Sequence, residues 1–342
     1  MIRAGPEGRA PARVFAAIDL GTNNCRLLIA TPSGDGFRIV DAFSRIVRLG
    51  EGLSATGRLS EAAMERALDA LAVCAGKIAR KSGCQVRAVA TQACRVADNA
   101  AEFLERAAAR TGLRLSVISA REEAELAVAG CSDLLDWTAD AALVLDVGGG
   151  SSELSWIDLA AARTRPAGAP LVAASLSVPL GVVTLAEMFP EAPPGDARTW
   201  RAMVEAMKAG IADFDGAARF EAAFREGRAH LVGTSGAITS LAGLHLRLAR
   251  YDRSRVDALW MSRSECDAVA ERLAALTIAE RGRQPCIGPD RADLVLAGAA
   301  ILRAVQEAWP CDRVRVADRG LREGLLLALM AEARDRRRWR RR

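Results

Sequence analysis

Residues 143–154, with the sequence LVLDVGGGSSEL, constrain the fold more than any other segment of this chain. An apolar run ends at Asp146, three glycines and two serines follow, and the apolar pattern resumes at Glu153. Consecutive glycines let backbone N–H groups approach a ligand without interference from a Cβ atom. A hairpin with such a turn is typical of a phosphate-binding loop, and its flanking carboxylates can hold a cation such as Mg²⁺ against the phosphate. A plain glycine-rich β-hairpin turn is the alternative interpretation of this segment by itself.

A second segment repeats the pattern near the N-terminus. Residues 15–30 read FAAIDLGTNNCRLLIA, an apolar run that ends at Asp19 and a short polar turn, followed by another apolar run. Two such hairpins in one chain predict a duplicated unit that closes on one ligand from two sides. A third loop, LVGTSGAITSLA at 231–242, precedes a helical pattern, and helix N-termini favour anions. Three loops of this kind in one chain favour phosphate binding over coincidence.

Length predicts two domains, and charge is concentrated at one end of the chain. A chain of 342 residues exceeds what one hydrophobic core usually serves. Its formal net charge of +5 comes from the last nine residues, which hold seven arginines and one aspartate. The body is therefore nearly neutral, and we expect neither a membrane partner nor a specific nucleic acid partner. The arginine-rich segment 334–342 is expected to be disordered or solvated.

Cysteine and histidine usage gives no indication of a zinc site. The eight cysteines are scattered without a C-x-x-C pair, and the chain has two histidines. Residues 1–13 are rich in Gly, Pro and Arg and lack the apolar core of a signal peptide. No apolar run approaches the length of a membrane span. We therefore expect a cytoplasmic protein with free thiols.

Hydrophobic periodicity predicts the same order of elements in both halves of the chain. Strands are expected at 14–20, 25–31, 36–43, 86–90 and 115–119, and then at 141–147, 153–158, 171–178, 229–233 and 313–317. Helices are expected at 60–81, with Ser60 as N-cap, 97–111, 121–135, 180–224, 235–250, 262–276, 290–309 and 319–337.

These motifs resemble the exopolyphosphatase/guanosine pentaphosphatase (Ppx/GppA) family. Four further segments carry the resemblance in the family's order: ATQACR at 90–95, ISAREEAELA at 118–127, GPDRADLVLAGAAIL at 288–302 and VADRGLREGLLL at 316–327. The resemblance implies an α/β fold of the actin/Hsp70-like (ribonuclease H-like) type, with two lobes. It also implies removal of the terminal phosphate from inorganic polyphosphate or from the alarmone pppGpp, and a homodimer.

The resemblance divides the chain into lobes. It implies a first lobe of residues 14–135 and 312–333, a second lobe of residues 136–311, a disordered N-terminus at 1–13 and a basic tail at 334–342. The last strand and helix are assigned to the first lobe by this resemblance. The chain looks like a short form of the family, without a C-terminal helical extension, which puts processive action on long polymers in doubt.

Glu123 matches the family's catalytic base, which activates the attacking water. Glu122 precedes it and projects about 100° away on a helix, so one of the two is expected to face solvent. Without the resemblance, two acidic residues in a first helical turn would simply complement the helix dipole. Ala120 stands where the family pattern has glycine, which stiffens the turn but spares both carboxylates.

The resemblance also implies a metal site and a phosphate site. Asp146 and Glu153 are the expected ligands of Mg²⁺, or of Mn²⁺ in its place, with Asp19 as a third candidate. Arg95 is the expected guanidinium, because its planar fork matches phosphate oxygens. The remaining phosphate-binding candidates are Gly21, Thr22, Asn23, Asn24, Gly148, Gly149, Gly150, Ser151, Ser152, Gly233, Thr234, Ser235 and Gly236.

Two other functions stay open at this level. A sugar kinase or ATPase of the same superfold would share the glycine loops, although such enzymes usually have a larger second lobe. A non-catalytic protein that binds the alarmone or polyphosphate would need the loops but not the carboxylates. The presence of all the candidate carboxylates favours the hydrolase.

Overall fold

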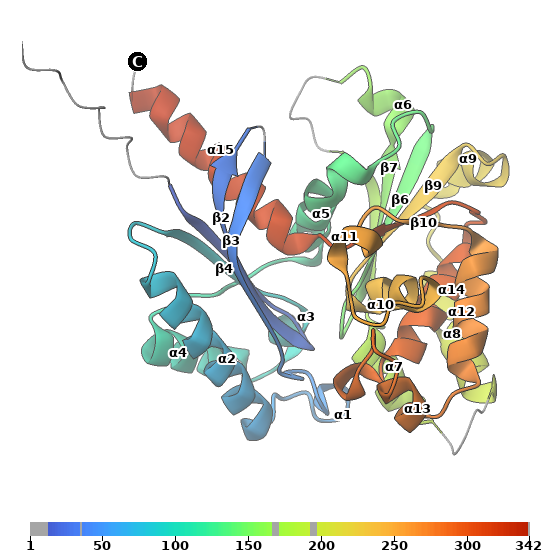
Figure 1. Cartoon of the computed structure of the whole chain (residues 1–342), viewed down its shortest axis with the longest axis horizontal. Helices are drawn as coiled ribbons and strands as arrows, with labels where there is room; N and C mark the ends of the chain where they lie inside the picture. Colours follow the sequence, from blue (N-terminus) through green and yellow to red (C-terminus); the bar gives the residue numbers. More distant parts are fainter. Residues whose placement is uncertain (1–12, 35, 166–170, 192–196, 341–342) are drawn as a thin grey trace, which may run out of the picture.

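The computed structural model describes residues 13–34, 36–165, 171–191 and 197–340. The N-terminus predicted to be disordered lies outside these residues, except for Arg13, whose guanidinium donates to the Ala333 carbonyl oxygen (3.4 Å). Two lobes lie side by side, each built on a mixed sheet (Figure 1). None of the described helices is long and apolar enough to cross a membrane.

The first lobe contains a sheet in the order β3-β2-β1-β4-β5. β1 and β2 form an antiparallel hairpin, β3 extends it, and β4 and β5 continue the sheet in parallel. The strands are β1 Phe15–Leu20, β2 Asn24–Ser33, β3 Gly36–Ile46, β4 Gln85–Ala90 and β5 Ser116–Val117, and the helices are α1 Leu53–Thr56, α2 Glu61–Ala79, α3 Gln92–Val96, α4 Ala100–Thr111 and α5 Ala120–Cys131.

The second lobe repeats this topology. Its sheet has the order β10-β11-β9-β6-β7-β8, in which β6 and β7 form the hairpin, β8 extends it, and β9 and β11 continue in parallel. The strands are β6 Ala141–Val147, β7 Ser152–Asp158, β8 Val172–Val178, β9 Ala229–Thr234, β10 Trp260–Met261 and β11 Val314–Ala317. The helices are α6 Leu159–Ala162, α7 Val182–Met188, α8 Ala197–Ile211, α9 Glu221–Arg225, α10 Gly236–His245, α11 Arg253–Val256, α12 Arg263–Ala274, α13 Ile278–Gly282 and α14 Val295–Ala308. The last helix, α15 Leu321–Arg340, follows β11 and packs on the sheet of the first lobe.

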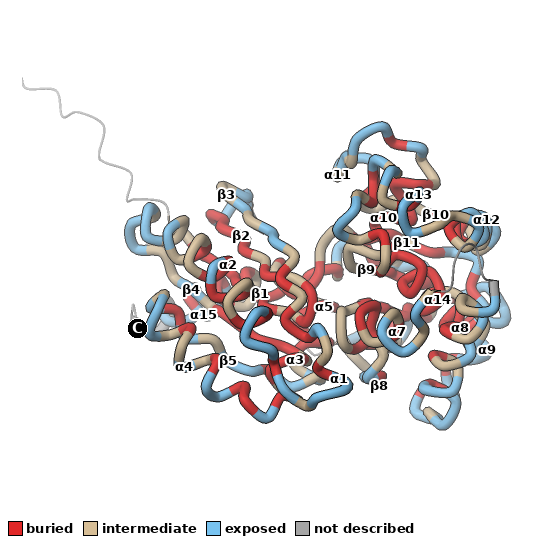
Figure 2. The backbone as a smooth tube through the Cα atoms, turned by 90° about the horizontal axis from the view of Figure 1, so that it is seen from below, coloured by how far each residue is buried: buried red, intermediate tan, exposed pale blue. Residues whose placement is uncertain are grey.

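The duplicated sheets make this the actin/Hsp70-like fold that the sequence predicts. Helices α2 and α4 cover one face of the first sheet, whereas α5 and α15 lie on its other face, between the two lobes. Figure 2 shows buried backbone along the central strands of both lobes and along α5. The two interlobe helices approach so closely that a Cβ atom on Gly324 would overlap the main chain of Leu126. This crossing joins the lobes beside the turns of both hairpins.

Serine side chains cap the starts of α2, as the sequence predicts, and of α5. The Ser60 side chain accepts a hydrogen bond from the Ala63 amide (3.2 Å), and Ser119 caps the Glu122 amide in the same way (3.1 Å). Ala120 is the first residue of α5, so the helix accommodates it in place of the family's glycine. Side-chain oxygens satisfy amides that a helix start would otherwise leave unpaired.

One lobe assignment is wrong. The strand at 314–317 does not belong to the first lobe, because β11 pairs in parallel with β9 of the second sheet and only α15 crosses to the first lobe. The arginine-rich segment, expected to be disordered or solvated, continues α15 as far as Arg340, and its Arg334 and Arg336 are exposed to solvent. Residues 341–342 lie outside the described part of the chain.

Candidate active site

The turns of the two hairpins have matching hydrogen bonds. The Gly21 amide donates to the Asn24 carbonyl oxygen (2.9 Å), and the Gly148 amide donates to the Ser151 carbonyl oxygen (2.9 Å). The Gly21 amide, expected to hold phosphate, is therefore occupied in closing its own turn. The amides that follow, at 22–23 and 149–150, donate to no group in the described part of the chain. Free amides in a tight turn form a concave anion site.

The two turns meet across the interlobe cleft. A Cβ atom on Gly149 would lie 3.0 Å from the Asn23 nitrogen and 3.0 Å from the Thr22 Cβ atom. Only glycine permits this approach without moving one loop, which explains the residue type at this position. The duplicated hairpins thus face one another, as the sequence predicts.

A cavity of about 560 Å³ opens between the lobes at these turns. Helix α10 begins at its wall, capped by Ser235, whose strained backbone has φ 113°. The predicted site residues that line the cavity are Asp19, Gly21, Thr22, Asn23, Asn24, Glu123, Asp146, Gly148, Gly149, Gly150, Ser151, Thr234, Ser235 and Gly236.

Asp19 and Asp146 are the equivalent carboxylates of the two hairpins. Each is the last residue but one of its strand, and neither accepts a hydrogen bond from any described residue. Burial raises the pKa of Asp146 to about 7, with further contributions from Glu153 and Asp19. Burial also raises the pKa of Asp19, although the nearby guanidinium of Arg26 opposes the shift. Two neighbouring carboxylates that line a cavity and accept no hydrogen bond or ion pair from a described residue favour a bound cation.

Glu123 lies in the first turn of α5 and is 8% exposed. Arg95 donates to its Oε2 atom (2.6 Å), and the same guanidinium is held by the Ile118 carbonyl oxygen (3.0 Å) and Gln92 Oε1 (2.9 Å). Burial, and then the charge of Glu153, raise the pKa of Glu123 to about 8 despite the arginine. A carboxyl group with such a pKa accepts protons readily near neutral pH. Glu122 instead forms a surface ion pair with Arg87 (2.8 Å), as expected for the member of the pair that faces away.

Two guanidinium groups from opposite lobes reach the start of α10. A Cβ atom on Gly236 would lie 3.6 Å from Nη2 of Arg26, on β2, and 3.6 Å from Nη1 of Arg291, in the 3-10 turn Pro289–Arg291. Neither guanidinium has a hydrogen-bond or ion-pair partner among the residues described. Unpaired arginines at a helix N-terminus form a strong anion-binding combination.

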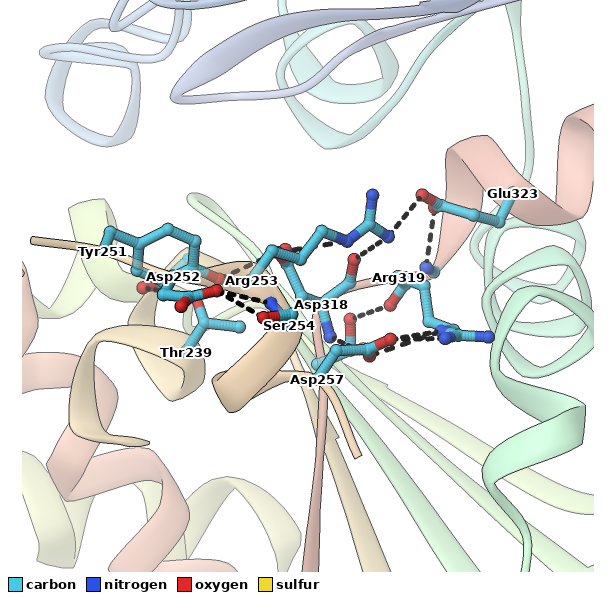
Figure 3. Close-up of polar contacts among 12 residues, drawn as sticks. Thr239, Tyr251, Asp252, Arg253, Ser254, Asp257, Asp318, Arg319 and Glu323 are labelled. Carbon is cyan, nitrogen blue, oxygen red and sulfur yellow. Dashed lines mark hydrogen bonds and ion pairs between the residues drawn. The ribbon is translucent and has the colours of Figure 1, made fainter. Parts of the chain in front are cut away.

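One wall of the cavity is a network of polar side chains (Figure 3). Arg253 donates to the Asp318 carbonyl oxygen (2.6 Å) and lies 3.6 Å from Oε1 of Glu323. Tyr251 donates its hydroxyl to the Asp318 carboxylate (2.8 Å). This network ties α11 of the second lobe to α15 where the chain crosses between the lobes.

Comparison with known proteins agrees with this geometry. Residues 28–333 match the model of the Ppx/GppA phosphatase family. The chain belongs to the Ppx/GppA family. It is 30% identical to exopolyphosphatase 2 of Mycobacterium tuberculosis, in an alignment that covers 92% of this chain and 98% of the relative. It is also similar to the solved Ppx/GppA enzyme of Aquifex aeolicus, with 29% identity, a TM-score of 0.73, and coverage of 93% and 100% of the two chains. A phosphatase of the hydrolase class follows from this membership.

Four predicted site residues do not line the cavity of this Ppx/GppA protein. Arg95 is turned toward Glu123, and Gly233 lies inside β9. Ser152 donates to the Leu180 carbonyl oxygen (2.7 Å) because strand alternation points it away from the cleft. Glu153 accepts hydrogen bonds from two serine hydroxyls, Ser151 (2.7 Å) and Ser177 (2.9 Å).

The sequence prediction named Arg95 and none of the arginines that line the cavity. Besides Arg26 and Arg291, they are Arg253, Arg319 and Arg322. All except Arg253 stand in segments that carry the Ppx/GppA resemblance, so the available signal was an arginine within or beside a family motif. Hydrophobic periodicity cannot predict that arginines from the two lobes line one cavity, because this depends on how the lobes pack together.

The residues of the cavity fit a magnesium ion. Thr22 Oγ1 and the Oδ1 atoms of Asn23 and Asn24 are buried without a hydrogen-bond partner among the described residues, and all three residues line the same cavity as the two aspartates. No group of three or more acidic, histidine or cysteine side chains in the described residues could enclose an ion by itself. Mg²⁺ is commonly held by one or two carboxylates, water and substrate phosphate, which suits this open set of oxygen donors.

Proposed function

We propose that this chain is an exopolyphosphatase, a hydrolase that releases the terminal phosphate of inorganic polyphosphate. One observation carries the proposal: Glu123, buried and with a raised pKa, opens onto the same cavity as the free turn amides of both lobes. The names of its relatives, exopolyphosphatases 1 and 2 of mycobacteria, favour polyphosphate as the substrate. The alarmone pppGpp is the second candidate substrate, because it ends in the same phosphoanhydride group.

The terminal phosphate would lie between the two turns. Amides at 22–23 and 149–150 would donate to its equatorial oxygens, and Arg26 and Arg291 would neutralise the next phosphates at the start of α10. Amide and guanidinium donors fixed in place stabilise the charge that spreads over these oxygens during transfer.

Glu123 would activate water. Its carboxylate accepts a proton as the water oxygen attacks the terminal phosphorus, and the bridging bond to the rest of the chain breaks, leaving orthophosphate and a polymer one unit shorter. Arg95, bonded to Glu123, is a positioning residue that keeps the carboxylate oriented and favours its ionised form.

Asp19 and Asp146 would hold Mg²⁺, and Glu153 would contact the ion through a water molecule. Bound there, the ion neutralises charge on the phosphates. Mn²⁺ would serve in its place, since it prefers the same oxygen ligands.

The test is phosphate release by the purified protein from polyphosphate and from pppGpp, with Mg²⁺ and with EDTA. Release from polyphosphate that EDTA abolishes and Mg²⁺ or Mn²⁺ restores supports the proposal. ADP formation from ATP with an acceptor sugar, and no phosphate release, would identify a kinase instead. Tight binding of polyphosphate without any release would identify a non-catalytic binding protein.

A further inference from the structure

We propose that Arg48 and Glu187 are positioning residues that set the distance between the two phosphate loops. This inference rests on the proposed function, since it concerns how the same site is held in working geometry. Both residues act through residues 47–54, called here the bridging segment, which runs from the end of β3 into α1. Neither Arg48 nor Glu187 lines the cavity.

The bridging segment supports the first phosphate loop directly. The Val47 and Arg48 amides donate to the Asn23 carbonyl oxygen (2.8 and 3.0 Å), and the Gly50 amide donates to the Thr22 carbonyl oxygen (2.9 Å). A shift of this segment therefore moves the turn whose free amides face the cavity.

The Arg48 side chain crosses to the second lobe. It forms a two-pronged ion pair with Asp293 (2.8 and 3.0 Å) and donates to the Asp290 carbonyl oxygen (3.2 Å). These acceptors flank Arg291, one of the two unpaired guanidiniums of the cleft. The backbone of Arg48 has φ 46°, a left-handed conformation that is uncommon for a residue other than glycine. Such strain often marks a functional position.

Glu187, on α7, forms the second contact between the lobes. Its carboxylate accepts hydrogen bonds from the Gly52 amide (2.9 Å) and the Ser54 hydroxyl (2.7 Å) of the bridging segment.

The first turn of α7 grips the second phosphate loop. The Val182 amide donates to the Gly148 carbonyl oxygen (3.0 Å), and the Val183 amide donates to the Gly149 carbonyl oxygen (2.8 Å). The bridging segment thus connects the first phosphate loop to two parts of the second lobe. One is α7, whose first turn donates hydrogen bonds to the second phosphate loop, and the other is the turn that contains Arg291.

The Arg48 and Asp293 side chains are 33% and 32% exposed. Partly exposed ion pairs and hydrogen bonds of this kind contribute little to global stability. The effect of Arg48 and Glu187 is therefore expected on the geometry of the cleft, where a displacement of about 1 Å can cost roughly 100-fold in rate. The melting temperature therefore distinguishes the two roles. A variant that loses only a positioning contact has a lower kcat/KM at an unchanged melting temperature, whereas loss of a structural contact lowers the melting temperature.

The activity test is a double-mutant cycle on Arg48→Ala and Asp293→Ala. Each single variant should lower kcat/KM for polyphosphate roughly 10- to 100-fold. The double variant should be no worse than the singles, since the pair acts as a unit. Arg106→Ala, which breaks a surface pair with Glu61 inside the first lobe, is the matched control and should leave kcat/KM unchanged. Equal losses in the control and in Arg48→Ala would overturn the proposal.

Glu187 provides an independent arm. Glu187→Ala should lower kcat/KM, and Glu187→Gln should restore most of it, because the amide oxygen still accepts from Gly52 or Ser54. If both variants are as active as the wild type, Glu187 has no positioning role.

Hydrogen exchange gives a readout that does not depend on activity. In Arg48→Ala and Glu187→Ala, peptides spanning 44–56 and 178–189 should exchange faster, while α2 keeps its protection. Unchanged exchange in both peptides would overturn the inference even if activity falls. Faster exchange in a protein that hydrolyses no polyphosphate would instead refute the proposed function and leave the positioning contacts established.

Discussion

Arg26 and Glu153 occupy the same position in the two repeated hairpins. Arg26 lies opposite Asp19 in the register of β1 and β2, and Glu153 lies opposite Asp146 in the register of β6 and β7. Burial raises the pKa of both aspartates; the charge of Arg26 opposes the rise at Asp19, whereas the charge of Glu153 adds to the rise at Asp146. The two hairpins thus differ in electrostatics, because a guanidinium lies opposite the aspartate in the first and a second carboxylate lies opposite it in the second.

Arg26→Gln should lower kcat/KM for polyphosphate about 10-fold or more, because a hydrogen bond to a charged group contributes roughly 1.5–3 kcal/mol. Steady-state phosphate release measures the effect. Arg45→Gln is the control, since Arg45 lies on the neighbouring β3, with its guanidinium over the Phe43 ring (5.2 Å). Equal losses in the two variants would mean that general positive charge, rather than the position of Arg26, assists binding.

Glu123→Gln should lower kcat by roughly 10²- to 10⁴-fold, the usual scale for loss of a general base, with little change in substrate binding. Glu122→Gln should be far milder, because Glu122 pairs with Arg87 on the surface. Single-turnover phosphate release together with a binding titration separates the two effects. Full activity of Glu123→Gln, or similar losses in both variants, would contradict the assignment of the base.

The metal-free protein should become less stable as the pH rises from about 5 to about 8. The folded state raises the pKa of Asp146 to about 7 and that of Glu123 to about 8, whereas both titrate near 4 in the unfolded chain. Between these values the folded state binds more protons, so the free energy of unfolding falls with rising pH.

Mg²⁺ should reverse this trend, because it binds the ionised carboxylates. The rise in melting temperature on adding Mg²⁺ should therefore be larger at pH 8.5 than at pH 5.5, and Asp146→Asn should reduce it. Thermal scans in EDTA and in Mg²⁺ test this. An equal shift at the two pH values would argue against a carboxylate metal site.

Gly130→Ala and Gly324→Ala should each destabilise the fold by about 1–3 kcal/mol, the usual cost of overpacking. A Cβ atom at either position would overlap main-chain atoms of the facing interlobe helix. Gly76→Ala, at an exposed position of α2 with open space around it, should instead stabilise by about 0.5–1 kcal/mol. Urea unfolding measures all three, and a stabilised Gly324→Ala would mean that the two helices are not packed this closely.

Truncation after Ala333 should raise KM for long polyphosphate, more at low salt than at high salt, and leave kcat unchanged. The removed residues hold seven arginines, which attract a polyanion through charge and paired hydrogen bonds. KM for pppGpp should stay nearly constant, because a small substrate does not reach the tail. An equal rise for both substrates would indicate damage to α15, and no change in either would mean a tail without a role in binding.

Local features of the site were predictable from the sequence. The alternation of apolar residues around Asp19 and Asp146 predicts both hairpins, and Ser60 predicts the start of α2, because each depends on residues close in the chain. The assignment of β11 to the first lobe, which rested on the family resemblance, is wrong. Its pairing with β9 joins residues far apart in the chain, about which periodicity carries no information.

The sequence by itself determined the two loops, their carboxylates and the family to which the chain belongs. Only the tertiary structure decided that Arg95 donates to Glu123, 28 positions along the chain, instead of pointing into the cavity. It also brought Arg26 and Arg291 from separate lobes to the start of α10. The physical reason is that turns and caps arise from neighbouring residues, whereas a guanidinium takes whichever acceptor the packing of the lobes places within its reach.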